Sequence, residues 1–357
     1  MKAYLIKYYV RLLLFLTPFV ICFLAYVIID PFMVIYQYDD FNKRSYIGKN
    51  RDYISTEMLM SNSQKYTYDS FILGSSTALS FAPSIWKDFI DTDNNVYTFD
   101  ASGENIVGIW SKIKYLHSNG YQLRNVLLVL ENNDFVPFVN DVPIFMKHTG
   151  VYPSSRFAFH YAFFLSSVEL KFVTAVAVHL VSGRFYPFMN DILVPGSYNY
   201  DPITNEFYNT GLWDAIKKDS VRFYVERASI FPLRTGEYAE DNRSISDQHR
   251  VMLEEIKNIF DDQGTSYRIL ISPALKQVSF NKDDLSILKN IFREEYVFDF
   301  TGINEFTESI ADYTDATHFK RGLAKRMLKI VYFQPEDKNI FIDIVDQGPI
   351  EPVREVL

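Results

Sequence analysis

The stretch that decides the fold is Tyr68-Asp69-Ser70-Phe71-Ile72-Leu73-Gly74-Ser75-Ser76, an apolar run that ends in one glycine and two serines. A short apolar run bounded by turn residues is typical of a buried strand, so we predict one over Ser70–Leu73. Four later runs share this pattern and are predicted as strands: Asn95–Phe99, Val126–Leu130, Tyr267–Ile271 and Tyr296–Phe300.

Between these runs, apolar residues recur at the spacing of an amphipathic helix. This spacing predicts four helices: Asn105–Ser118, one from Ser246 to a stop at Gly264, one around Leu285–Phe292, and a last one over Phe319–Tyr332. Continuous apolar strands that alternate with amphipathic helices favour an α/β fold in which helices cover both faces of a parallel five-stranded sheet.

The composition excludes several classes of protein. With 357 residues the chain holds two domains or one enlarged domain, and 48% hydrophobic residues exclude a disordered chain. A net charge of -8 without a basic run argues against nucleic-acid binding. The single cysteine, Cys22, excludes an intrachain disulfide and a cysteine-rich zinc site, and the histidines lack metal-ligand spacing. We therefore expect neither a metal nor a cofactor.

The N-terminus predicts a membrane anchor. Leu12–Ile29 is a run of 18 residues without a charge, and Lys2, Lys7 and Arg11 precede it. Such a run is long enough to span a bilayer, and the preceding charges place the N-terminus in the cytoplasm and all later residues outside. A cleaved signal peptide is the alternative, but the run is long for one and no A-x-A-like site follows. A buried core helix is a weaker alternative, because the run has no polar face.

A long insertion separates the third and fourth strands. It contains the strongly apolar segment Phe157–Val181, for which a second membrane span is the alternative interpretation. Glu169 and Lys171 lie in its middle, where each charge costs roughly 2.5–3.5 kcal/mol of insertion free energy. A span would also put the last two strands on the opposite side from the first three. We therefore expect cap helices here, of a kind that can lie on a bilayer surface.

The expected domain organisation follows from these segments. Residues 1–30 form the cytoplasmic N-terminus and anchor, residues 31–67 a stalk, residues 68–134 and 246–333 the catalytic domain, residues 135–245 the cap, and residues 334–357 an acidic tail.

Residues suited to acyl transfer follow the predicted strands. Ser76 can act as a nucleophile if a base takes its proton, and His318 is the candidate base. Asp315 lies three residues earlier and can fix the imidazole tautomer. The backbone N–H groups of Ser76 and Gly103 and the side-chain amide of Asn133 can stabilise an oxyanion. In an open parallel sheet, these loops meet at the carboxyl ends of the strands.

Each of these short motifs alone has an ordinary structural interpretation. Ser76 can cap a helix after a turn, Asp315 can cap the last helix, and His318 can be a surface residue. Asn133 alone is a turn signal and Gly103 a loop glycine. Their conjunction, with the needed residue type in four separate loops, favours an assembled site.

With these blocks in this order, the chain resembles the SGNH/GDSL hydrolase superfamily over residues 68–134 and 246–333. The matching blocks are Gly74-Ser75-Ser76, Ser102-Gly103, Glu131-Asn132-Asn133-Asp134 and Asp315-Ala316-Thr317-His318. The resemblance implies a three-layer flavodoxin-like fold in which Ser76 is the nucleophile, His318 the base and Asp315 its orienter, with Ser76, Gly103 and Asn133 forming the oxyanion hole. Two residues depart from the family pattern, because Ser75 replaces an aspartate and Glu131 a glycine.

The expected function is that of a membrane-anchored, extracytoplasmic serine esterase or O-acyltransferase that acts on acyl esters of a surface polysaccharide or envelope glycan. The resemblance is to anchored proteins such as the D-alanyl transfer protein of teichoic acid synthesis and alginate O-acetylation proteins, and it implies a multi-spanning acyltransferase partner. The alternative is a non-catalytic SGNH-like envelope protein that binds glycan or scaffolds a polysaccharide synthesis complex.

Overall fold

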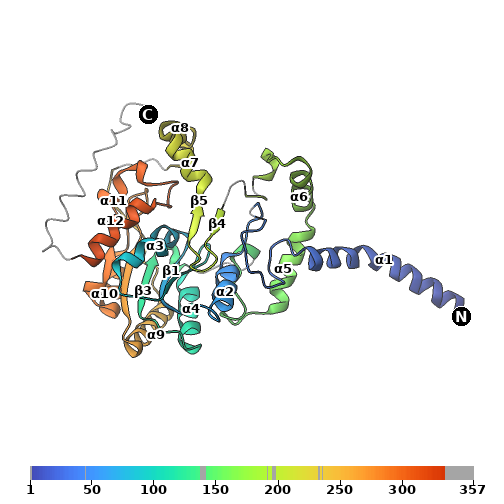
Figure 1. Cartoon of the computed structure of the whole chain (residues 1–357), viewed down its shortest axis with the longest axis horizontal. Coiled ribbons are helices and arrows are strands. Elements are labelled where there is room, and N and C mark those ends of the chain that lie inside the picture. Colours follow the sequence, from blue (N-terminus) through green and yellow to red (C-terminus); the bar gives the residue numbers. More distant parts are fainter. Residues whose placement is uncertain are drawn as a thin grey trace.

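The computed structural model describes residues 2–44, 46–136, 142–190, 192–194, 198–231, 234 and 236–333. Its centre is a five-stranded sheet in which every neighbouring pair is parallel (Figure 1). The spatial order is β2-β1-β3-β7-β9. The strands are β1 (Tyr68–Gly74), β2 (Asn95–Asp100), β3 (Asn125–Leu130), β7 (Ser266–Ile271) and β9 (Val297–Asp299). The parallel sheet predicted from the five apolar runs is thus confirmed.

The register brings the carboxyl ends of the first three strands to one edge of the sheet. Gly74, the last residue of β1, pairs with Asp100 on β2 and Val129 on β3. Gly74 has a φ of +154°, and a Cβ atom there would lie 2.5 Å from the Val129 carbonyl oxygen. A residue without a side chain is therefore required where β1 passes into the loop that carries Ser76.

Helices cover both faces of the sheet because its side chains alternate between two separate buried clusters. On one face, apolar residues such as Phe71 and Leu128 pack against four helices: α2 (Arg51–Asn62), α4 (Ile106–Ser118), α9 (Asp247–Gln263) and α10 (Lys282–Phe292). On the other face, residues such as Ile72 and Leu127 pack against three helices: α3 (Pro83–Trp86), α11 (Glu305–Glu308) and α12 (Arg321–Tyr332).

Helix α2 belongs to this core, whereas a stalk is expected over residues 31–67. Its Ile54, Met58 and Leu59 are buried against the sheet. Asn50 caps the helix by accepting a hydrogen bond from the N–H of Tyr53 at 2.8 Å. The helix is hard to find by apolar spacing, because four of its buried residues are polar: Arg51, Asp52, Ser55 and Thr56.

The insertion after β3 is divided in space: its first two helices lie apart from its last two (Figure 1). It contains α5 (Arg156–Val168), α6 (Leu170–Ser182), α7 (Thr210–Lys218), α8 (Ser220–Glu226) and an antiparallel pair, β4 (Tyr198–Tyr200) and β5 (Phe207–Asn209). A further short parallel pair joins β6 (Ala239–Glu240) to β8 (Val278–Ser279). The apolar segment Phe157–Val181 is two helices bent by 61° at Glu169.

Helix α1 (Lys2–Ile29) projects away from the rest of the chain (Figure 1). Its segment Tyr4–Ile29 is, among the described residues, the one unbroken helical segment that is long and apolar enough to cross a membrane. Its side chains are exposed from Tyr4 to Leu24, and burial begins only near Tyr26. The predicted acidic tail, residues 334–357, lies outside the described residues.

Candidate active site

Three of the residues that we predicted for catalysis form one hydrogen-bonded chain. His318 Nε2 lies 2.7 Å from Ser76 Oγ, and His318 Nδ1 lies 2.8 Å from Asp315 Oδ2. Because Nδ1 faces a carboxylate, it carries the imidazole proton, which leaves Nε2 free to accept a proton from Ser76. The geometry is that of an activated serine nucleophile.

The turn after β1 presents the Ser76 hydroxyl. Ser75 is extended and precedes a 3-10 helix, Ser76–Phe81, so Ser76 occupies the first helical position. The first N–H groups of a helix have no partner within that helix. The N–H of Ser76 is therefore suited to bind a developing oxyanion close to its own hydroxyl.

The loop that carries His318 is fixed by Asp315 itself. Asp315 Oδ1 accepts the backbone N–H of Thr317 at 3.0 Å and that of His318 at 2.9 Å. In addition, the N–H of Thr314 donates to the carbonyl of His318 at 2.8 Å. One carboxylate therefore closes the turn and orients the imidazole, which ties the loop conformation to the position of the base.

Asp315 and His318 each shift the pKa of the other. Burial raises the pKa of Asp315, but its hydrogen bonds and the charge of His318 outweigh that effect and lower the pKa to about 2. Burial lowers the pKa of His318, yet the hydrogen bond and charge of Asp315, with the charge of Glu131, bring it above the ordinary value of 6.5. Asp315 is therefore ionised at neutral pH.

These shifts predict the pH dependence of ester turnover. Only the neutral imidazole of His318 can accept the Ser76 proton, so kcat/KM should fall as pH decreases through the pKa of His318. Because that pKa is raised, the midpoint should lie above pH 6.5. A pH profile of p-nitrophenyl acetate hydrolysis measures it. Replacing Glu131 with Gln removes a nearby negative charge and should move the midpoint to lower pH. An unmoved midpoint would contradict this electrostatic assignment.

A half-buried carboxylate, which we did not predict as a site residue, holds the serine turn through hydrogen bonds. Glu131 Oε1 accepts hydrogen bonds from the hydroxyls of Ser75 and, at 2.8 Å, Thr77, the two neighbours of Ser76. Burial raises the pKa of Glu131, an effect that the Thr77 hydrogen bond and the charge of His318 oppose. Asp134 in turn accepts the N–H of Glu131 at 2.7 Å. Glu131 thus fixes both residues that flank Ser76.

The two remaining oxyanion candidates differ in position. Gly103 follows β2 in a left-handed conformation, with φ +56°, and its neighbour Ser102 lines the cavity beside Ser76. Asn133 lies in a 3-10 helix after β3, with an exposed side chain, and it is not among the described residues that line this cavity. The structure therefore brings the Gly103 loop to the cavity wall but not the Asn133 side chain.

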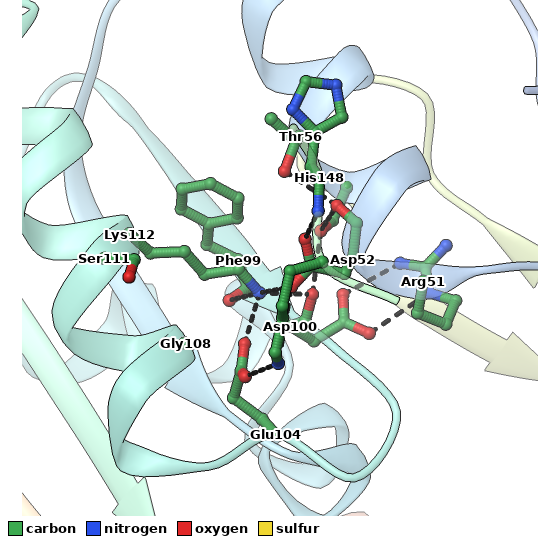
Figure 2. Close-up of polar contacts among 12 residues, drawn as sticks. Arg51, Asp52, Thr56, Phe99, Asp100, Glu104, Gly108, Ser111, Lys112 and His148 are labelled. Atoms are coloured by element: carbon green, nitrogen blue, oxygen red, sulfur yellow. Dashed lines mark hydrogen bonds and ion pairs between the residues drawn. The ribbon is translucent and has the colours of Figure 1, made fainter. Parts of the chain in front are cut away.

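A buried network of charges includes Glu104, the residue after Gly103, and its partner Lys112 (Figure 2). Lys112 donates to Glu104 at 2.6 Å and lies 3.4 Å from Asp52, and Lys147 also pairs with Glu104. Burial lowers the pKa of Lys112, but the charges of Asp52 and Glu104 outweigh it and raise the pKa. Glu104 directly follows Gly103, so the network fixes this loop.

A second ion pair joins this network to the cavity. Arg51 from α2 donates to both carboxylate oxygens of Asp100, at 3.1 and 2.8 Å, and both residues line the cavity (Figure 2). The Arg51 guanidinium also lies 3.5 Å from the centre of the Tyr200 ring. Its Nη1 has no hydrogen-bond partner among the described residues. We did not predict Arg51; its only sequence signal is the cap Asn50-Arg51-Asp52.

A cavity of about 750 Å³ is lined by Ser76, Asp315 and His318 together with residues of the insertion such as Tyr198 and Trp213. Its wall includes five aromatic side chains, Tyr198, Tyr200, Phe207, Trp213 and Phe319, and five cationic ones, Lys49, Arg51, Arg227, Lys320 and Arg321. Its two carboxylates are engaged, Asp100 with Arg51 and Asp315 with His318. The cavity is thus aromatic and positively charged in a chain whose net charge is -8.

No protein-family model matches the chain, and no curated protein is significantly similar to it in sequence.

Proposed function

We propose that this protein is a serine esterase or O-acyltransferase that uses Ser76, His318 and Asp315 to form an acyl-enzyme. The observation that carries the proposal is the continuous hydrogen-bonded chain from Ser76 Oγ through His318 to Asp315 at the wall of a large cavity. Ser76 and His318 are 242 positions apart in sequence, yet their side chains are hydrogen-bonded. The order hydroxyl, imidazole, carboxylate is the one that nucleophilic catalysis by serine needs.

The proposed reaction has two steps. Ser76 Oγ attacks the carbonyl carbon of an ester while its proton moves to His318 Nε2. When the tetrahedral intermediate collapses, the bond to the leaving alcohol breaks and His318 returns the proton to that alcohol. Water or a sugar hydroxyl then gives a proton to His318 and attacks the acyl carbon. The bond to Ser76 Oγ breaks, and His318 returns the proton to that oxygen. The N–H groups of Ser76 and Gly103 would stabilise the oxyanion, with Asn133 as a third candidate donor.

Membership of the SGNH superfamily is part of this proposal. The spatial order β2-β1-β3-β7-β9 is the flavodoxin-like one, and the site lies at the strand ends where that order reverses. The two departures from the family pattern are in contact, because the hydroxyl of Ser75 donates to Glu131. The carboxylate of Glu131 thus lies beside the turn in which Ser75 replaces the aspartate of the family pattern.

An envelope glycan is the substrate class that we propose. Aromatic side chains suit the apolar faces of sugar rings, and the cations and the unpartnered Arg51 Nη1 suit their oxygen substituents. With α1 as an anchor and the cavity on the extracytoplasmic side, the substrate would be held at the cell surface. A multi-spanning acyltransferase that supplies acyl groups is the partner that this assignment implies.

Labelling by a fluorophosphonate probe tests the proposed function against the alternative of a non-catalytic glycan-binding scaffold. An activated serine attacks the probe, so the full-length protein should be labelled and Ser76→Ala should lose the label. Ser80 also lines the cavity, but its hydroxyl donates to the Phe319 carbonyl at 2.6 Å, so Ser80→Ala is the matched control and should keep the label. An unlabelled wild-type protein would favour the scaffold.

A further inference from the structure

Helices α5 and α6 expose apolar side chains on the face opposite to the one that they bury. On α5, Phe159 and Phe163 are buried, whereas Phe157, Tyr161 and Leu165 repeat at helical spacing and are 78, 51 and 47% exposed. On α6, Leu170, Val173, Leu180 and Val181 are 79, 47, 65 and 91% exposed. A helix that is apolar on both faces is normally buried in a protein or in lipid.

Helix α5 packs directly on the end of the apolar helix α1. The ring of Phe164 lies 6.0 Å from that of Phe23 and 5.7 Å from that of Tyr26. At 1.5 Å per residue, Phe23 and Tyr26 lie about 9 Å and about 4.5 Å before Ile29, where α1 ends. Helices that lie in a membrane interface sink their apolar faces about 5–10 Å into it. The contact thus holds α5 at interfacial depth if α1 spans the bilayer.

The geometry of α5 and α6 suits a position along the membrane surface. Each helix has 13 residues and is about 20 Å long, too short for the roughly 30 Å hydrocarbon core. Strand β3, before the pair, and strand β7, after it, are neighbours in one sheet, so the pair cannot make a single crossing. Figure 1 shows α1 pointing away from α5 and α6, as a spanning helix beside surface helices would.

We propose that the outer faces of α5 and α6 lie in the membrane interface beside α1, with lipid as their partner. The aromatic residues Phe185, Tyr186 and Phe188, which follow α6 and are 38, 37 and 53% exposed, extend this surface. Aromatic side chains are enriched at that depth. Together with α1, this surface would hold the domain that contains the five-stranded sheet against the bilayer. The proposal does not depend on the chemistry of Ser76.

Fluorescence quenching of the full-length protein in nanodiscs that hold one copy each tests this placement. Cys22, the sole cysteine, is exposed on α1 and serves as the positive control for lipid contact. In a Cys22→Ser background, Leu165→Cys and Leu180→Cys report on the proposed surface. Val251→Cys on α9, where Val251 is 55% exposed, is the matched aqueous control. Each site carries a bimane label, and the quenchers are spin-labelled lipid and aqueous iodide.

Labels at 165 and 180 should be quenched several-fold more by lipid, and less by iodide, than the label at 251. Iodide quenching equal to that at 251 would overturn the proposal, because the surface would then face water. Protection from both quenchers would also overturn it, because protein would then cover the surface. If lipid did not quench the label at Cys22, both the membrane anchor and this proposal would be contradicted. The result of fluorophosphonate labelling would be unaffected.

Discussion

Asp315→Asn is expected to lower kcat for ester turnover by about 10⁴-fold while the protein stays folded. An asparagine amide in place of the carboxylate can hold His318 in the wrong tautomer, with the Nε2 position protonated and unable to accept the Ser76 proton. The amide also cannot stabilise the imidazolium that forms during the reaction. Steady-state hydrolysis of p-nitrophenyl acetate by the full-length protein in detergent measures the loss.

The matched control is Asp312→Asn, three residues earlier. Asp312 pairs with Arg326 at 3.1 Å and not with a histidine, so the same chemical change should leave kcat within a few-fold of wild type. The asparagine at 315 can still accept the N–H groups of Thr317 and His318 through its carbonyl oxygen, which preserves the loop. A kcat for Asp315→Asn close to that of Asp312→Asn would contradict the role of Asp315.

The sheet could be predicted from the sequence because its first three strands are almost entirely buried and therefore contain short apolar runs. For example, every residue of Tyr68–Gly74 is buried. The Ser76, His318 and Asp315 arrangement could also be predicted, because parallel strands deliver their following loops to one edge. Asn133 shows the limit of this reasoning, since it lies in a short helix after β3 with an exposed side chain and is not among the described residues that line the cavity.

The buried charges could not be predicted from apolar periodicity. Arg51 and Asp52 look solvent-facing in sequence, and only pairing with partners from β2 and α4 makes their burial possible. The sequence holds one signal of this buried network: Lys112 lies between Ile109 and Ile113 on the apolar face of α4. A lysine at such a position indicates a buried carboxylate partner, but it does not say which one.

Glu104→Ala is expected to lower the free energy of unfolding by about 3–5 kcal/mol, the usual cost of removing one partner from a buried ion pair. The side chain of Glu104 is fully buried and pairs with Lys112 and Lys147, which are 1 and 6% exposed. After its removal, Asp52 would still face the two lysines, at 3.4 and 3.7 Å. The buried cluster would then hold one negative charge fewer around the same two lysines. Denaturant unfolding in detergent, followed by circular dichroism, measures the change.

Two comparisons separate this cost from simple loss of packing. Glu255→Ala breaks an exposed pair with Lys114, in which the side chains are 43 and 45% exposed, and should cost about 1 kcal/mol or less. The double variant Glu104→Met, Lys147→Met removes one charge of each sign and should recover most of the stability that Glu104→Ala loses, because the remaining buried charges again balance. If the double variant were less stable than Glu104→Ala, uncompensated charge would not be the cause. Because Glu104 follows Gly103, the single variant should also impair the loop that carries the proposed oxyanion donor.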